Sequence, residues 1–271
     1  MEQFFFGDGS ERLFGTFTGP NGRARTGLVF CPPFGEEMVA TYARFARWSK
    51  ELADRGIAVM RYHPRGTGES DGSSAEFTFT SAAEDAATAV QWLRKRAGVE
   101  RVGMLGLRFG ASAAVYAAAQ ADFLVVWSPV INLRLYFRDL LRLRITKDLI
   151  HLKADHVKVT SKDLTSELEA GRSIDLLGYE TSPELYRQMT ASVSWPNEPP
   201  APEVLWLGLP SEQARAEAIM NGWKDLGCRA EVQIYREPVF WEDFSLDFPH
   251  QFAESSIAWM ERQAVEASGV R

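Results

Sequence analysis

Short apolar runs alternate with longer amphipathic segments along most of the chain. The apolar runs cover residues 3–6, 13–18, 26–31, 57–62, 102–107, 123–130, 204–209 and 230–235. Such short runs are typical of strands, most of them buried on both faces of a sheet. Between them, apolar residues recur with helical spacing over residues 41–54, 81–96, 109–120, 211–226 and 251–267. The alternation predicts an α/β fold with a mostly parallel, doubly wound sheet.

The alternation stops between residues 132 and 202. This stretch has helical patterns and no convincing buried strand. We therefore expect a core of residues 1–131 and 203–271, and a helical cap of residues 132–202 inserted after the sixth strand. Binding loops are expected at the carboxyl ends of the parallel strands.

Composition narrows the classes of function. A chain of 271 residues with 45% hydrophobic and 24% charged residues is ordinary for a soluble globular protein. The net charge of −6 disfavours a nucleic-acid partner, and no apolar run is long enough to span a membrane. Without a signal peptide and with only two cysteines, the expected location is cytoplasmic. The four histidines lack metal-ligand spacing, and we expect neither metal nor cofactor.

Three loops carry the residues that are candidates for catalysis or binding. Gly106–Gly110 (G-L-R-F-G), between a predicted strand and helix, has the glycine spacing of the G-x-S-x-G nucleophile elbow. His63–Ser70 (H-P-R-G-T-G-E-S) and Cys31–Met38 (C-P-P-F-G-E-E-M) follow two other strands. Together they resemble the α/β-hydrolase superfamily, and are most similar to its exosortase-associated and serine-aminopeptidase-like hydrolases. The resemblance implies an α/β-hydrolase fold over nearly the whole chain.

The departures from this resemblance decide which chemistry we expect. Arg108 stands where these hydrolases need Ser, Cys or Asp, and a guanidinium is no nucleophile at neutral pH. The loop expected to hold the catalytic acid has no carboxylate before Glu212. The loop expected to hold the catalytic histidine, residues 237–242, contains no histidine. An ordinary Ser-His-Asp mechanism is therefore not expected.

Arg108 has two interpretations. It pairs with a carboxylate in a degenerated site, or it clamps an anionic ligand beside a helix N-terminus. In both cases we expect it to contact Glu36, Glu37, Glu242 or a bound anion, because a positive charge is unfavourable at that helix end. Glu36 and Glu37 are candidates for acid–base catalysis or for a salt bridge, and Glu242 is a third candidate catalytic carboxylate.

The remaining polar candidates each have a structural alternative. His63 is either a turn residue or a general base. His250 is either the first residue of a helix or a displaced catalytic histidine. Ser128 lies at a strand tip, where it can contact a ligand, and Ser112 is expected to pack on the sheet. Cys31 is expected in the core.

The predicted cap carries a basic stripe of Arg134, Arg138 and Arg142 on one helix face. The stripe is either a solvated face or an entrance that attracts an anionic substrate. In the second case, reversing Arg138 and Arg142 to Glu weakens binding. His151 and His156 lie in the same cap and are expected to be exposed.

Aromatic residues complete the predicted pocket. The chain has 17 Phe, 8 Trp and 7 Tyr. Because aromatic side chains bury large areas, we expect these rings to fill the ligand pocket as well as the core. Rings at strand ends and in the residue 240–252 loop are expected to surround Arg108. The expected ligand-contacting side chains are Phe34, Phe109, Trp127, Ser128, Trp241 and Arg138.

Three functions remain open from the sequence. The first is a remodelled or inactive hydrolase-like protein that binds a small acidic or acyl ligand, with atypical acid–base chemistry or none. The second is an esterase or thioesterase with relocated catalytic residues, and the third a non-enzymatic scaffold of a biosynthetic cluster. The expected partner is a small molecule that is anionic or linked to coenzyme A or a carrier protein, and a homodimer is left open.

Overall fold

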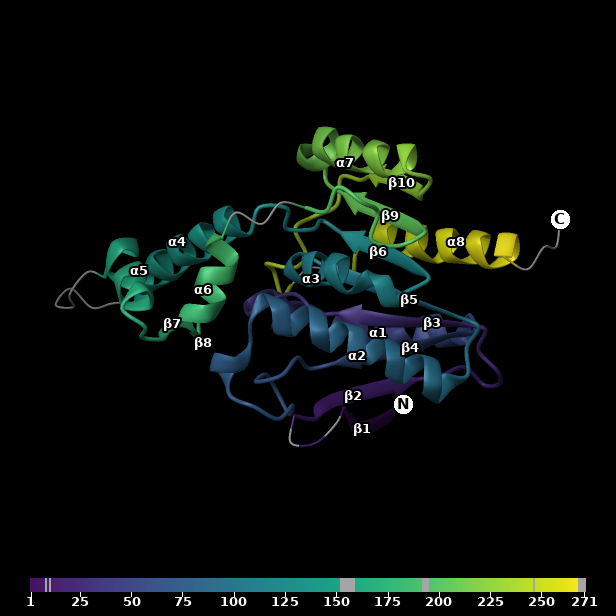
Figure 1. Cartoon of the computed structure of the whole chain (residues 1–271), viewed down its shortest axis with the longest axis horizontal. Coiled ribbons are helices and arrows are strands. Elements are labelled where there is room, and N and C mark those ends of the chain that lie inside the picture. Colours follow the sequence, from purple (N-terminus) through teal and green to yellow (C-terminus); the bar gives the residue numbers. More distant parts are fainter. Residues whose placement is uncertain (8, 10, 152–158, 192–194, 246, 268–271) are drawn as a thin grey trace.

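The computed structural model describes residues 1–7, 9, 11–151, 159–191, 195–245 and 247–267, without the side chains of residues 149–151 and 267. Its main sheet has the strand order β1-β2-β4-β3-β5-β6-β9-β10 (Figure 1). These strands are β1 (Glu2–Phe6), β2 (Leu13–Thr18), β3 (Thr26–Cys31), β4 (Ile57–Tyr62), β5 (Arg101–Leu107), β6 (Phe123–Trp127), β9 (Glu203–Gly208) and β10 (Arg229–Ile234). Strand β2 runs against both of its neighbours, and the other pairs are parallel. The predicted mostly parallel sheet is confirmed.

Helices cover both faces of this sheet. One face packs against α1 (Glu36–Asp54) and α8 (His250–Ala267). The other packs against α2 (Phe79–Ala97), α3 (Phe109–Ala117) and α7 (Gln213–Asp225). Short 3₁₀ turns occur at Ser74–Glu76, Ala118–Gln120 and Pro210–Glu212. The doubly wound arrangement follows from the parallel strands, since each crossover must return across one face.

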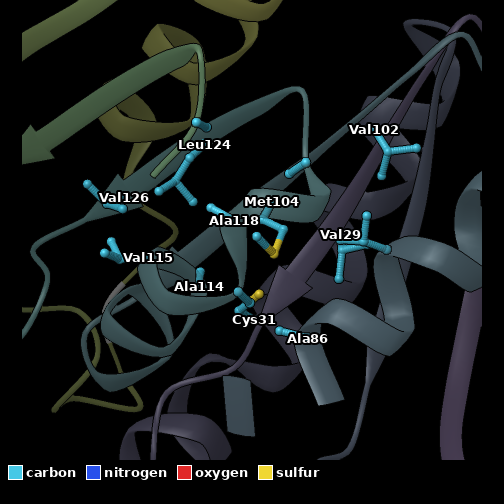
Figure 2. Close-up of a cluster of buried hydrophobic side chains, with 14 of the residues drawn as sticks. Val29, Cys31, Ala86, Val102, Met104, Ala114, Val115, Ala118, Leu124 and Val126 are labelled. Carbon is cyan, nitrogen blue, oxygen red and sulfur yellow. The ribbon is translucent and has the colours of Figure 1, made fainter. Parts of the chain in front are cut away.

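Strand β3 illustrates how both faces are filled. Leu28 and Phe30 point toward α1 and α8, whereas Val29 and Cys31 point toward α2 and α3, because successive side chains of a strand alternate. Figure 2 shows Val29 and Cys31 in the second of these layers, beside Ala86 of α2. Cys31 is 3% exposed and is a core residue, as predicted. This burial raises the pKa of its thiol to about 12.

Between β6 and β9, the helices and strands of the 132–202 segment gather at one end of the sheet (Figure 1). Its elements are α4 (Leu133–His151), α5 (Ser161–Glu169), β7 (Ile174–Leu176), β8 (Tyr179–Thr181) and α6 (Pro183–Thr190). The expectation that it contains no buried strand is wrong, because β7 and β8 pair and β7 buries two of its three side chains. Strands of three residues are too short to show a period-two pattern.

A shared apolar cluster joins the 132–202 segment to the rest of the protein. It combines Phe34, Phe77, Phe79 and Phe109 with Tyr136, Phe137, Leu168, Leu176, Leu185 and Met189. The first four rings come from the loops and helix starts after β3, β4 and β5. The segment therefore packs over the strand ends where binding loops were expected.

Two element boundaries differ from the sequence prediction near these strand ends. Helix α1 starts at Glu36 rather than at residue 41, because Gly35 turns the chain with a φ of 62° and acidic side chains suit a first helical turn. Strand β6 stops at Trp127 rather than at residue 130, because Ser128 has a φ of 42°. None of the described helices combines the length and apolar character needed to cross a bilayer.

Candidate functional site

A cramped turn places Arg108 between β5 and α3. Its φ of 53° and ψ of −120° are unusual for a residue with a side chain. A Cβ on Gly110 would lie 2.3 Å from the carbonyl oxygens of Cys31 and Pro32, and Gly106 is similarly closed by the backbone of α3. The two glycines allow the helix to approach the sheet this closely, which leaves the side chain of Arg108 at the strand end.

Arg108 is held from several sides. Its Nε donates to Oε1 of Glu37 at 3.3 Å, and its Nη1 donates to the carbonyl oxygen of Ser128 at 3.3 Å. Its Cζ lies 5.7 Å from the ring centroid of Tyr136 and 5.1 Å from that of Trp241, within cation–π range. The predicted contact with a carboxylate is confirmed at Glu37. Within the described residues, no hydrogen bond reaches Nη2.

Glu37 is a buried carboxylate with both oxygens engaged. Tyr136 Oη donates to Oε2 at 3.0 Å, opposite the Arg108 bond to Oε1. Burial raises the pKa of Glu37, although Arg108 and Tyr136 oppose this rise. Burial and the adjacent Glu37 raise the pKa of Tyr136 well above its ordinary value. Burial disfavours the charge of Arg108, but Glu37 more than offsets this effect and its pKa rises, so the guanidinium stays protonated.

A second ion pair, between Lys147 and Glu36, lies near the Arg108–Glu37 pair. Lys147 Nζ lies 2.6 Å from Oε1 of Glu36, which joins α4 to the first turn of α1. Both side chains are more than one-third exposed, so solvent screens the pair. Glu36 and Glu37 are adjacent in the chain, yet Glu37 pairs with Arg108 and Glu36 pairs with Lys147 of the 132–202 segment.

These groups line a cavity of about 580 Å³, a size suited to a small molecule. Arg108, Glu37 and Tyr136 contribute polar atoms. Much of the remaining wall is apolar and includes Phe34, Val130, Ile131, Leu140, Leu143, Leu176, Leu177, Tyr179, Trp241 and Phe244. The cavity therefore offers a guanidinium and an apolar surface to the same occupant.

Two further charges stand at the cavity without ion-pair partners among the described residues. Glu242 comes from the loop after β10, and Arg215 comes from α7. Both side chains are exposed. The charge of Glu242 helps to raise the pKa of Glu37. No group of three or more side chains suited to hold a metal ion occurs within the described residues.

The structure brings six of the predicted site residues to this cavity. They are Phe34, Glu36, Glu37, Arg108, Trp241 and Glu242. Of the aromatic loop that was expected to face Arg108, Trp241 and Phe244 line the cavity, whereas Phe240 and Phe252 are buried in the core.

Three residues expected to contact a ligand instead lie beneath the cavity. Phe109 is 1% exposed and packs in the apolar cluster shared with the 132–202 segment. Trp127 is fully buried against α1 and α8, because its position in β6 points it to that face. The Ser128 side chain is also fully buried, and only its carbonyl oxygen reaches Arg108. These three placements correct the sequence-based prediction.

The described histidines lie away from Arg108. His63 lines a separate small cavity, where its Nδ1 lies 2.7 Å from Oε2 of Glu69. His250 is exposed at the start of α8 and does not line the Arg108 cavity. His156 and the side chain of His151 lie outside the described residues. Burial lowers the pKa of His63.

The basic stripe of α4 also faces away. Arg138 lies 3.3 Å from Asp139 and is exposed, and Arg134 donates to the carbonyl oxygen of Thr190. The α4 positions at the cavity are Asp139, Leu140, Leu143 and Lys147. Arg138 immediately precedes Asp139, and Arg142 immediately precedes Leu143. Because successive residues of an α-helix are rotated by about 100°, the stripe lies about 100° around the helix from the cavity-lining face. The expectation that Arg138 contacts the ligand is thereby corrected.

Sequence reasoning missed Tyr136, Lys147 and Arg215. The half-buried Glu212 does not line the cavity. Partial burial raises its pKa, and the N–H of Leu209, the Ser128 side chain and the charge of Arg108 oppose this rise. Tyr136 and Lys147 belong to a helix that was interpreted through its arginines alone. A signal was present, since residues 136, 140, 143 and 147 share one helical face.

Comparisons with known proteins agree with this architecture. Residues 20–139 match the family described as X-Pro dipeptidyl-peptidase (S15 family). DcsB in complex with its substrate analogue superposes with a TM-score of 0.64 and 16% identity, over 96% of this chain and 98% of DcsB. Est1E from Butyrivibrio proteoclasticus, with ferulic acid bound, gives a TM-score of 0.62 and 15% identity, over 97% and 99% of the two chains.

A third solved structure, α/β hydrolase domain-containing protein 10 from mouse, gives a TM-score of 0.57 and 15% identity, over 97% of this chain and all of the mouse chain. No curated protein matches the sequence. The strand order, the helices on both faces and these superpositions define the class of protein: the chain has the α/β-hydrolase fold.

Proposed function

We propose that this protein is a remodelled α/β-hydrolase-fold protein that binds a small acidic or acyl ligand between its core and a cap formed by residues 132–202. It acts by atypical acid–base chemistry or by binding alone. The observation that supports this most is the position of Arg108 in the cramped turn between β5 and α3, which we interpret as the nucleophile elbow of this fold. Arg108 lines the 580 Å³ cavity, and its Nη2 is left unbonded by the described residues.

The ligand class follows from the two kinds of surface around this cavity. The acidic group of the ligand accepts a charge-assisted hydrogen bond from Arg108 Nη2, with Arg215 as a second cation. The acyl part packs along Leu140, Leu143 and Leu176. If the protein retains chemistry, Glu37 is the proton-transferring group, because it lines the cavity and burial raises its pKa above the ordinary value.

An esterase or thioesterase with relocated catalytic residues is the alternative, and no described contact favours it. Its nucleophile would be Ser128, whose Oγ is buried, and its base would be His63 or His250, neither of which lines the cavity. The neighbours DcsB and Est1E support the fold alone at their low identities. A non-enzymatic scaffold is the remaining possibility, and it predicts no ligand at all.

Calorimetric titration with fatty acids, acyl-coenzyme A esters and sugar phosphates tests the proposal. We expect one class of acidic ligand to bind, and Arg108→Gln to weaken its binding by about 10- to 100-fold. Arg138→Gln is the matched control and leaves affinity unchanged, since Arg138 is exposed and paired with Asp139. Loss of binding in both variants, or in neither, would contradict the role of Arg108.

A fluorophosphonate probe separates the alternatives. The proposed function expects no labelling, because none of the described residues that line the cavity is a serine. Labelling that Ser128→Ala abolishes would overturn the proposal in favour of an esterase. If none of the ligands binds and no labelling occurs, the scaffold is the better account.

A further inference from the structure

Arg61 of β4 is a buried cation without a carboxylate partner. It is 7% exposed, and its Nε is buried and makes no hydrogen bond within the described residues. None of the described carboxylates forms an ion pair with it. A charge removed from water without such a partner is costly unless another group of opposite charge compensates it.

A second unsatisfied polar atom lies beside it. Thr16 of β2 is the register partner of Arg61 in the antiparallel pair β2–β4, so the two side chains project from the same face of the sheet a few ångströms apart. Thr16 is 4% exposed, and its Oγ1 is buried without a hydrogen-bond partner among the described residues. Two neighbouring donors thus lack an acceptor, whereas buried polar atoms of native proteins are nearly always paired.

A small cavity opens beside Arg61. Its volume is about 30 Å³, and its lining includes Arg61, Tyr42, His63, Met38 and Thr41. Thr16 is not among the lining residues and adjoins the cavity only through its register partner Arg61. It shares no lining residue with the cavity at Arg108. The space suits a single water-sized particle and no organic molecule.

The surrounding groups do not supply the missing negative charge. The Tyr42 ring lies over the guanidinium of Arg61, with 5.0 Å between its centroid and Cζ. The Glu69 carboxylate engages His63 instead, at 2.7 Å from Nδ1. Met38 and Thr41 carry no charge. The compensating charge must therefore come from outside the described chain.

We propose that Thr16 and Arg61 form a binding site for one small inorganic anion, with chloride as the physiological ligand. The anion accepts hydrogen bonds from Arg61 Nε and Thr16 Oγ1, and it neutralises the guanidinium. A water molecule, which is smaller than chloride, satisfies both donors but leaves the buried charge uncompensated. The site stabilises the packing of α1 on β2 and β4, and it is independent of the function proposed for Arg108.

The test compares thermal unfolding in sodium chloride, sodium bromide and sodium gluconate at equal ionic strength. We expect chloride and bromide to raise Tm saturably, by about 2–4 °C relative to gluconate. Thr16→Val, which is close to isosteric, weakens the apparent chloride affinity several-fold, and Arg61→Met removes the response. The control Arg55→Met removes an exposed arginine that has carboxylate partners and keeps the full response.

Two outcomes would overturn the site. Equal Tm values in chloride and gluconate for the wild-type protein mean that water alone fills the cavity. A chloride response that survives unchanged in Thr16→Val and in Arg61→Met assigns it to another part of the surface. If Arg61→Met fails to fold, anomalous diffraction from bromide-soaked crystals decides the matter, since a bromide peak beside Arg61 is required and its absence refutes the site.

Discussion

The hydroxyl of Tyr136 donates to Oε2 of Glu37 at 3.0 Å, which connects α4 of the 132–202 segment to the first turn of α1. Tyr136→Phe removes this donor and leaves a buried carboxylate oxygen unsatisfied. We expect the free energy of unfolding to fall by about 1–3 kcal/mol, measured by urea denaturation. Tyr186→Phe removes a hydroxyl that bonds the exposed Glu169, and it serves as the control with a smaller effect. Equal losses in both variants would contradict the burial argument.

Arg108 and Glu37 should behave as one unit in a double-mutant cycle. Arg108→Met strands the buried charge of Glu37, and we expect a loss of about 2–4 kcal/mol, because removing one partner of a buried pair is costly. Glu37→Gln added to that variant restores part of the loss, since the amide carries no charge. Additive effects in urea denaturation would show that the two side chains are energetically independent.

The raised pKa of Glu37 makes stability depend on pH. In the folded state this carboxyl holds its proton more tightly than in the unfolded chain, where the ordinary value is 4.5. Its contribution is therefore fully present below 4.5 and is lost as pH rises through the higher folded value. Relative to Glu37→Gln, the wild-type protein should lose stability as pH rises above 4.5. Urea midpoints from pH 4 to pH 8 check this, and a constant difference between the two proteins would refute the raised pKa.

Two glycine substitutions should have opposite effects. A Cβ on Gly110 would meet two carbonyl oxygens at 2.3 Å, whereas one on Gly222 in α7 would meet nothing within 4 Å. Gly110→Ala is expected to prevent folding or to cost more than about 2 kcal/mol. Gly222→Ala is expected to stabilise the helix by about 0.5–1 kcal/mol. Thermal unfolding of both variants decides, and a mild effect of Gly110→Ala would argue against the tight elbow.

Most strands and helices could be predicted because buried parallel strands and amphipathic helices leave strong local patterns. The position of Arg108 could also be predicted, since Gly106 and Gly110 frame it in the sequence. The partner Tyr136 could not, because its contact with Glu37 joins residues 99 positions apart and no local pattern records it. Trp127 was misplaced for a different reason. It lies at the strand end, but the alternation of side chains along β6 points it toward α1 and α8, and a strand buried on both faces gives no sequence signal of which face is which.

The bond between Tyr136 and Glu37 has a consequence for protein engineering. The polar centre of the cavity takes its guanidinium and carboxylate from one part of the chain and its phenol from the other. The 132–202 segment is thus no interchangeable module. A graft from a relative without a tyrosine at this place would keep the sheet intact while leaving the buried carboxylate with one hydrogen-bond donor fewer, so the two parts must change together.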